Sequence, residues 1–115
     1  MYDIEYTSNF KNQFKRLLKK YPRSEEEFKQ VFEKLESGDL IGIAYNNLGL
    51  EENEDVYKVM VANIDANRSP KNGFRMIYYA IKNDRLIYML AVYSKKEISN
   101  LKQHEVKDLI RKYCK

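Results

Sequence analysis

The sequence predicts an α+β fold in which an N-terminal strand and a helical hairpin pack on a mainly antiparallel, four- to five-stranded sheet, followed by a C-terminal helix. Three observations predict it. The first 37 residues carry the apolar spacing of two helices, residues 40–93 carry strand-like patterns, and the later strands are joined by short turns. The length of 115 residues suits one domain, which we expect to span residues 1–115.

The N-terminal third begins with a strand and continues with two helices. Apolar and acidic residues alternate over residues 2–6, as in a half-buried strand. Thr7 offers an N-cap to the first helix, Pro22 ends it, and Ser24 with Glu27 forms a capping-box pattern for the second. Each helix has one apolar face: Phe10, Phe14, Leu17, Leu18 and Tyr21, then Phe28, Val31, Phe32 and Leu35. The opposite face of the first helix carries cations: Lys11, Lys15, Arg16, Lys19 and Lys20.

The rest of the chain has the pattern of strands and a final helix. Strands are expected at residues 40–45, 56–62, 74–81 and 85–93. The apolar run from Leu86 to Val92 predicts a central strand covered on both faces. In the strand 56–62, Lys58 and Met60 should face opposite to Tyr57 and Val59. The last helix gathers four apolar residues on one face: Val106, Leu109, Ile110 and Tyr113.

Charge is distributed unevenly along the chain. The net charge is +4, with a pI near 9.0. Residues 38–74 hold three basic and six acidic groups, whereas residues 75–115 hold ten basic and four acidic groups. We therefore expect a polyanionic partner to dock near the C-terminal third. The alternative is a solvated lysine-rich surface, which charge alone does not exclude.

Several function classes have no support in the sequence. There is no Gly-rich phosphate loop, no GxSxG elbow and no HExxH motif. The single histidine and single cysteine, His104 and Cys114, cannot form a tetrahedral zinc site of nitrogen and sulfur ligands, and we expect His104 on the surface. One cysteine also fits a reducing compartment, and the N-terminus does not read as a signal peptide. A cytoplasmic location is therefore the expectation.

An ordered set of motifs in the strand region is more specific. It comprises the strand Val56-Tyr57-Lys58-Val59-Met60-Val61, then Lys71-Asn72-Gly73 with Phe74-Arg75-Met76-Ile77-Tyr78-Tyr79, and finally Tyr93-Ser94-Lys95-Lys96. This set resembles the RelE-type toxins of bacterial toxin–antitoxin modules, in the branch that includes HigB-like proteins. The strand–helix–helix order before it and the helix after it also match, so the resemblance covers nearly the whole chain.

The resemblance implies a metal- and cofactor-free endoribonuclease, or mRNA interferase, that cuts messenger RNA in the ribosomal A site and is neutralised by an antitoxin, often of helix-turn-helix type. By matching position, Lys58, Arg75 and Lys96 are the expected catalytic residues. Arg75 would hold phosphate oxygens in a fork, and either lysine would help to move protons. The expected substrate-binding residues are Arg68, Lys71, Tyr93 and Lys95, with Tyr93 stacking on a base or holding a phosphate.

The sequence also departs from the family pattern, and alternatives follow. Met60 stands where many relatives have a basic residue, a loss that Lys71 or Arg68 would have to offset. One alternative is a ParE-like toxin that poisons DNA gyrase, and another is a decayed toxin that binds its antitoxin without cutting RNA. In a purely structural alternative, Arg75 pairs with an acid of the run at residues 51–55.

Overall fold

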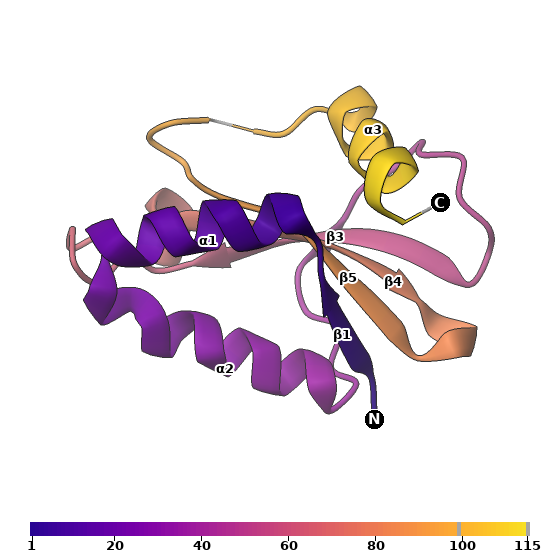
Figure 1. The fold of residues 1–115 in the computed structure, drawn as a ribbon, viewed down its shortest axis with the longest axis horizontal. Coiled ribbons are helices and arrows are strands. Elements are labelled where there is room, and N and C mark those ends of the chain that lie inside the picture. Colours follow the sequence, from indigo (N-terminus) through magenta and orange to yellow (C-terminus); the bar gives the residue numbers. More distant parts are fainter. Residues whose placement is uncertain (99, 115) are drawn as a thin grey trace.

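The computed structural model describes residues 1–98 and 100–114 (Figure 1). Its elements follow in the order β1 (Asp3–Tyr6), α1 (Ser8–Lys20), η1 (Pro22–Ser24), α2 (Glu25–Glu36), β2 (Ile43–Ala44), β3 (Glu54–Val61), η2 (Pro70–Asn72), β4 (Phe74–Ile81), η3 (Lys82–Asp84), β5 (Leu86–Ser94) and α3 (Gln103–Tyr113). This confirms the predicted α+β class. None of the helices in these residues has both the length and the apolar character needed to span a bilayer.

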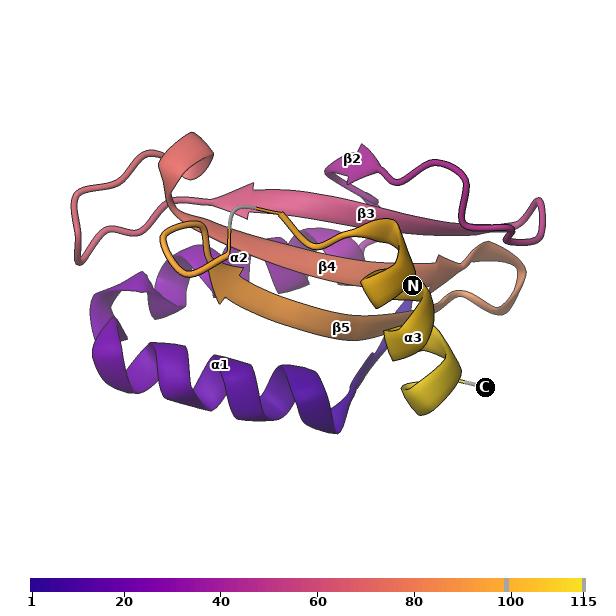
Figure 2. The ribbon, with the colours of Figure 1, turned by 90° about the horizontal axis from the view of Figure 1, so that it is seen from above.

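The five strands form one sheet in the order β1-β5-β4-β3-β2. Only β1 pairs in parallel, with β5, and the other three pairings are antiparallel. The long strands β3, β4 and β5 therefore lie side by side, as Figure 2 shows. A turn that contains η3 joins β4 to β5, whereas residues 62–73, which include η2, join β3 to β4. Residues distant in sequence therefore meet in rows across the sheet.

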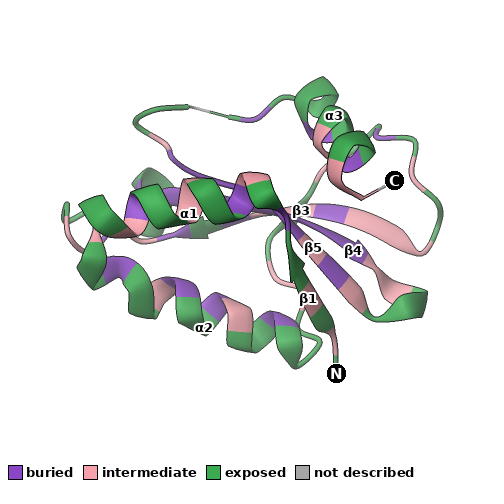
Figure 3. Cartoon of the chain, viewed as in Figure 1, coloured by how far each residue is buried: buried purple, intermediate pink, exposed green. Residues whose placement is uncertain are grey.

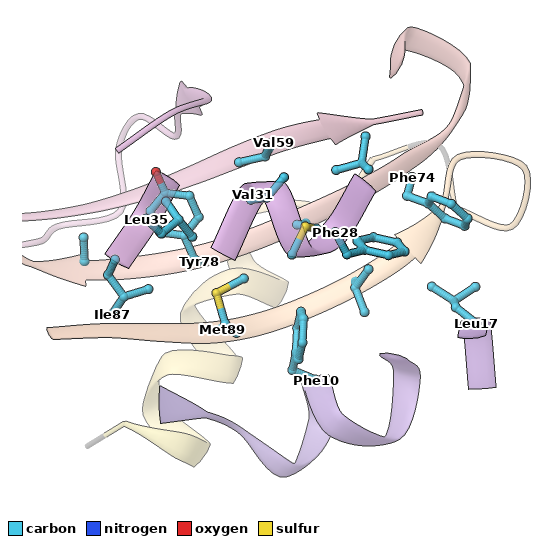
Figure 4. Packing of buried hydrophobic residues seen from close by; sticks show 14 residues of the cluster. Phe10, Leu17, Phe28, Val31, Leu35, Val59, Phe74, Tyr78, Ile87 and Met89 are labelled. Atoms are coloured by element: carbon cyan, nitrogen blue, oxygen red, sulfur yellow. The ribbon is translucent and has the colours of Figure 1, made fainter. Parts of the chain in front are cut away.

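The helical hairpin of α1 and α2 covers one face of the sheet (Figure 1). Alternate residues of β3, β4 and β5 point toward it, and Phe10 and Phe28 pack among them (Figure 4). Phe28 lies 4.9 Å from Phe74 between ring centroids. Burial of these large aromatic and aliphatic side chains is the main source of stability for this half of the molecule.

Helix α3 packs on the opposite face through Val106 and Ile110. These residues meet a second apolar cluster that includes Val56, Ile77 and Leu90. Strand β5 is therefore covered on both faces, as its apolar run predicts. The same arrangement confirms the predicted facing of β3, because Val59 joins the first cluster and Val56 the second.

Of the two helix N-caps predicted from the sequence, the structure confirms the cap of α1 but not that of α2. Thr7 caps α1, since its hydroxyl accepts a hydrogen bond from the Phe10 amide at 3.2 Å. The capping box predicted at Ser24 is wrong. Ser24 Oγ donates instead to Asp65 Oδ1 at 2.7 Å and accepts from the Ile64 amide at 3.2 Å, which ties the loop after β3 to the junction of the two helices.

The strand predicted at residues 40–45 shortens to Ile43–Ala44. Gly42 approaches the backbone so closely that a β-carbon there would lie 2.6 Å from the Lys58 carbonyl oxygen, and its φ is +114°. Only glycine accepts both the contact and this left-handed backbone. Leu40 and Ile41 before it pack against the first core cluster without joining a strand, and the Ile41 carbonyl accepts a 2.6 Å hydrogen bond from the Tyr78 hydroxyl.

Candidate nucleic-acid interface

The candidate site begins with a row of residues across three strands on the α3 side of the sheet. Met60 pairs with Arg75, and Arg75 pairs with Tyr93. Lys58 lies one pleat away from Met60, roughly 6–7 Å along β3 on the same face. The register therefore brings together Lys58, Arg75 and Tyr93, which the sequence predicted as site residues.

Arg75 is almost buried, with 5% of its surface exposed. Its Nη2 donates to the Lys71 carbonyl at 2.7 Å, and its Nη1 donates to the carbonyls of Pro70 and Phe74 at 3.2 and 3.3 Å. The guanidinium thus holds the η2 turn to the sheet. In this conformation most of its donors are used by backbone carbonyls, so the fork expected for phosphate oxygens is not free.

The pairing of Arg75 with the acidic run is also ruled out by the register. Glu54 pairs with Ile81, at the other end of β4 from Arg75. Six residues of extended strand separate the two positions, about 20 Å. Asp55 instead binds Lys82, with 2.7 Å between Oδ2 and Nζ.

Tyr93 lies beneath the segment that leads from β5 to α3. Its side chain is 2% exposed, and its hydroxyl accepts a hydrogen bond from the Leu101 amide at 3.1 Å. The Tyr45 hydroxyl donates to the Leu101 carbonyl at 2.9 Å. Burial raises the pKa of both tyrosine hydroxyls. Tyr93 therefore anchors Leu101 and offers no free ring face for a base in this conformation.

Lys58 is half-buried and lies next to the same segment. Its Nζ donates to the Asn100 side-chain oxygen at 3.2 Å. An amide oxygen is neutral, so this bond positions the ammonium group without cancelling its charge. Met60, by contrast, is 37% exposed. It lies on the same sheet face as Lys58 but is uncharged.

The remaining predicted cations gather where β3 and β5 end and β4 begins. Arg68, Lys95 and Lys96 line one shallow depression together with Asn72, and Lys71 is exposed on the adjoining η2 turn. We call Arg68, Lys71, Lys95 and Lys96 the basic rim. The rim is built by backbone pairing, because the Lys95 amide donates to the Gly73 carbonyl at 2.9 Å.

The charge of the basic rim is not neutralised within residues 1–98 and 100–114. The ion pairs there join Arg16 to Glu97, Lys82 to Asp55, and Arg111 to Asp108. Lys95 Nζ meets only the neutral Asn72 oxygen, at 3.4 Å. Arg68, Lys96 and the half-buried Lys95 surround one depression with no carboxylate among its lining residues, and the exposed Lys71 lies beside it. Such a surface is suited to phosphate groups.

Residues 1–98 and 100–114 hold no candidate metal site. No group of three or more His, Cys, Asp or Glu side chains in the described parts of the chain is arranged to hold a metal ion. His104 is exposed on α3, as predicted. Glu51, Glu52 and Glu54 instead line a hollow with Asp84 at the far end of the sheet.

Two residues that shape the site were not predicted. Asn72 contacts Lys95, and Asn100 contacts Lys58. Both are single asparagines in loops, a residue type common in turns for backbone reasons alone. Each contact joins residues more than 20 positions apart in the sequence. No local sequence pattern therefore distinguishes these two asparagines from others in turns.

Comparison with known proteins gives no relative: no protein-family model matches the chain, and no curated protein matches it. The resemblance to RelE-type toxins therefore stays a prediction from the motifs.

Proposed function

We propose that this protein is a RelE-type toxin: an endoribonuclease that binds the backbone of messenger RNA at the basic rim and cuts it on the ribosome. A co-expressed antitoxin neutralises it. The observation that carries the proposal is the clustering of Arg68, Lys95 and Lys96 around one depression, beside the sheet face that bears Lys58. All three are among the cations predicted from the sequence as catalytic or substrate-binding residues.

The chemistry asked of these residues is transfer within the RNA itself. The 2′-hydroxyl attacks the adjacent phosphorus and the bond to the 5′ oxygen breaks, leaving a 2′,3′-cyclic phosphate and a free 5′-hydroxyl. One proton leaves the 2′ oxygen and one reaches the 5′ oxygen, and we assign both movements to Lys58 and Lys96. The rim cations stabilise the negative charge that develops on the phosphorane.

Arg75 then acts as a positioning residue. Its bonds to the Pro70 and Lys71 carbonyls fix the turn that presents Lys71, and its charge adds to the potential at the rim. Neither a glutamate nor a histidine is among the residues that line the depression. The ribosome must therefore help to align the message for in-line attack.

A second candidate function is RNA binding without cleavage, by a decayed toxin that still binds its antitoxin. Two observations favour it: Arg75 is bound to carbonyls, and Met60 supplies no cation where the family pattern has one. Both functions use the same rim, so they differ only in whether the phosphate reacts.

Primer extension on two copies of one message, one translated and one with its start codon removed, tests the proposal. We expect cuts in the translated copy only. The double variant Lys95→Gln/Lys96→Gln should cut at least a hundredfold less, since loss of one preorganised donor costs on the order of 10²–10³ in rate.

Lys29→Gln/Lys34→Gln is the matched control, because it removes two exposed lysines from α2. It should cut like the wild type. Equal cutting of both messages would contradict ribosome dependence. Rim-dependent RNA binding with no cutting at all would select the second candidate.

A further inference from the structure

Helix α1 carries five cations and no acidic residue in its 13 residues. Lys11, Lys15, Arg16, Lys19 and Lys20 are all exposed, and we call them the α1 stripe. Figure 3 shows the helix exposed on its outer side and buried where it meets the sheet. Like charges four residues apart repel, by roughly 0.2–0.5 kcal/mol per pair. The stripe contains three such pairs, so its charges lower the stability of the folded chain.

The fold itself does little to neutralise the α1 stripe. Of its members, only Arg16 has an ion-pair partner in the described residues, Glu97 at 3.8 Å between Nη2 and Oε2. Both side chains are largely exposed, and such pairs contribute little. Lys20 Nζ lies 5.4 Å from the ring centre of Tyr21, which leaves its charge intact.

The α1 stripe is held rigidly by the packing of the helix. Phe10 and Leu17 are buried in the core beneath it. The edge of β5 is also fixed to the helix, because Asn9 Nδ2 donates to the Leu90 carbonyl at 2.8 Å and Gln13 Oε1 accepts from the Val92 amide at 3.0 Å. Positions four residues apart are separated by about 6 Å along the helix axis. Lys11, Lys15 and Lys19 therefore form a row that is inclined to the helix axis and extends about 12 Å along it.

The α1 stripe leads toward the basic rim. Asn9 contacts Leu90 and Gln13 contacts Val92, so α1 runs in the same direction as β5. Its C-terminal half reaches the segment after β5, where Arg16 meets Glu97 beside Lys96. Figure 2 shows α1 running alongside β5 toward the end of that strand. The α1 stripe and the basic rim therefore lie next to each other.

We infer that the α1 stripe is a second phosphate-binding surface, which takes the backbone of double-stranded RNA beside the single strand held at the basic rim. This inference rests on the proposed function. A rigid row of cations suits the regularly spaced phosphates of a duplex, which are recognised by shape and charge. A membrane surface fits less well, because the apolar face that would insert into it is buried in the core.

The test compares the affinity for two RNAs over a range of salt concentrations: an unstructured strand, and the same strand joined to a short hairpin. The wild type should bind the hairpin RNA more tightly and with a steeper salt dependence. Lys11→Gln/Lys15→Gln/Lys19→Gln should lower that slope by about 2 to 3, because each phosphate contact contributes about 0.9 on a duplex. Its affinity for the unstructured strand and its thermal stability should not fall.

Two further variants make the result interpretable. Lys29→Gln/Lys34→Gln/Lys107→Gln removes three exposed charges elsewhere and should leave the salt slope for the hairpin RNA as in the wild type. Lys95→Gln/Lys96→Gln should weaken binding of both RNAs. If that rim variant binds the unstructured strand like the wild type, the proposed function fails, whatever α1 does.

Two other results would overturn the inference while leaving the proposed function standing. One is an α1 variant that binds the hairpin RNA like the wild type, or no differently from the three-charge control. The other is loss of binding to phosphatidylserine vesicles with unchanged binding to both RNAs, which would assign the stripe to a membrane surface.

Discussion

At the scale of single residues, a buried cation is stable only when its donors are satisfied. Arg75 meets this condition through the carbonyls of Pro70, Lys71 and Phe74. Arg75 therefore mainly stabilises the turn at Pro70 and Lys71, and its charge adds to the electrostatic potential of the site. The expectation from the motif alone, a free fork on the scissile phosphate, omitted these carbonyls.

Arg75→Ala should lower the free energy of unfolding by about 1–3 kcal/mol, because it removes three part-buried or buried hydrogen bonds to backbone carbonyls. Arg75→Lys keeps the charge but loses the forked donor group. Its free energy of unfolding should lie between those of the wild type and Arg75→Ala. Urea denaturation followed by circular dichroism measures this. An Arg75→Ala variant as stable as the wild type would mean that the guanidinium does not hold the turn.

Met60→Arg should leave stability within about 0.5 kcal/mol of the wild type, as is usual for exposed positions. The added guanidinium lies in the row with Arg75 and one pleat from Lys58, so RNA binding and cleavage should increase. Met60→Gln is the neutral control. A lowered melting temperature with no gain in cleavage would place the active face elsewhere.

At the scale of elements, the pairing of strand ends builds the basic rim, and Gly73, just before β4, passes close to the end of β3. A β-carbon at Gly73 would collide with the Val61 carbonyl oxygen. Its backbone is not left-handed, so the requirement here is space and not φ.

Gly73→Ala should therefore force the two strands apart and cost about 1–3 kcal/mol, as overpacking does. The Lys95 amide bonds to the Gly73 carbonyl, so the rim should be displaced as well. Thermal denaturation and RNA affinity should both fall. Gly49→Ala, at a position with open space but a φ of +69°, shows the cost of backbone strain alone.

Stability at alkaline pH depends on a contact between β4 and the loop before β2. Burial, with the charges of Tyr57 and Asp39, raises the pKa of the Tyr78 hydroxyl well above 10.0. The unfolded chain releases this proton near pH 10, and the folded chain keeps it, so stability is full below pH 10 and falls as the pH rises. Melting temperatures between pH 8 and 11 should fall less steeply for Tyr78→Phe than for the wild type; equal slopes would contradict this.

The helices and strands could be predicted from the sequence, whereas most side-chain contacts between distant segments could not. Periodicity was enough to predict the three α-helices, the facing of β3 and the double burial of β5, because these follow from which side chains avoid water. The capping box at Ser24 failed because its hydroxyl binds Asp65, 41 residues away. The burial of Arg75 and Tyr93 likewise depends on where the turn at Pro70 and the segment at Leu101 lie, which no local pattern specifies.

At the scale of the whole molecule, charge is separated along the sheet. The basic rim lies at one end, whereas residues 51–54 and Asp84 line a hollow at the other. Such a separation orients an approaching polyanion toward the rim, and salt weakens the effect because the Debye length is only about 8 Å at physiological ionic strength. The α1 stripe extends the basic end along the helical face.

The most direct test of RNA recognition at the basic rim is the salt dependence of the affinity for an unstructured RNA strand. Each phosphate contact contributes a slope of about 0.7 on a single strand. Lys95→Gln/Lys96→Gln should therefore reduce the slope by about 1.4, whereas Lys29→Gln/Lys34→Gln should leave it unchanged. A rim variant that keeps the wild-type affinity and slope would contradict the account.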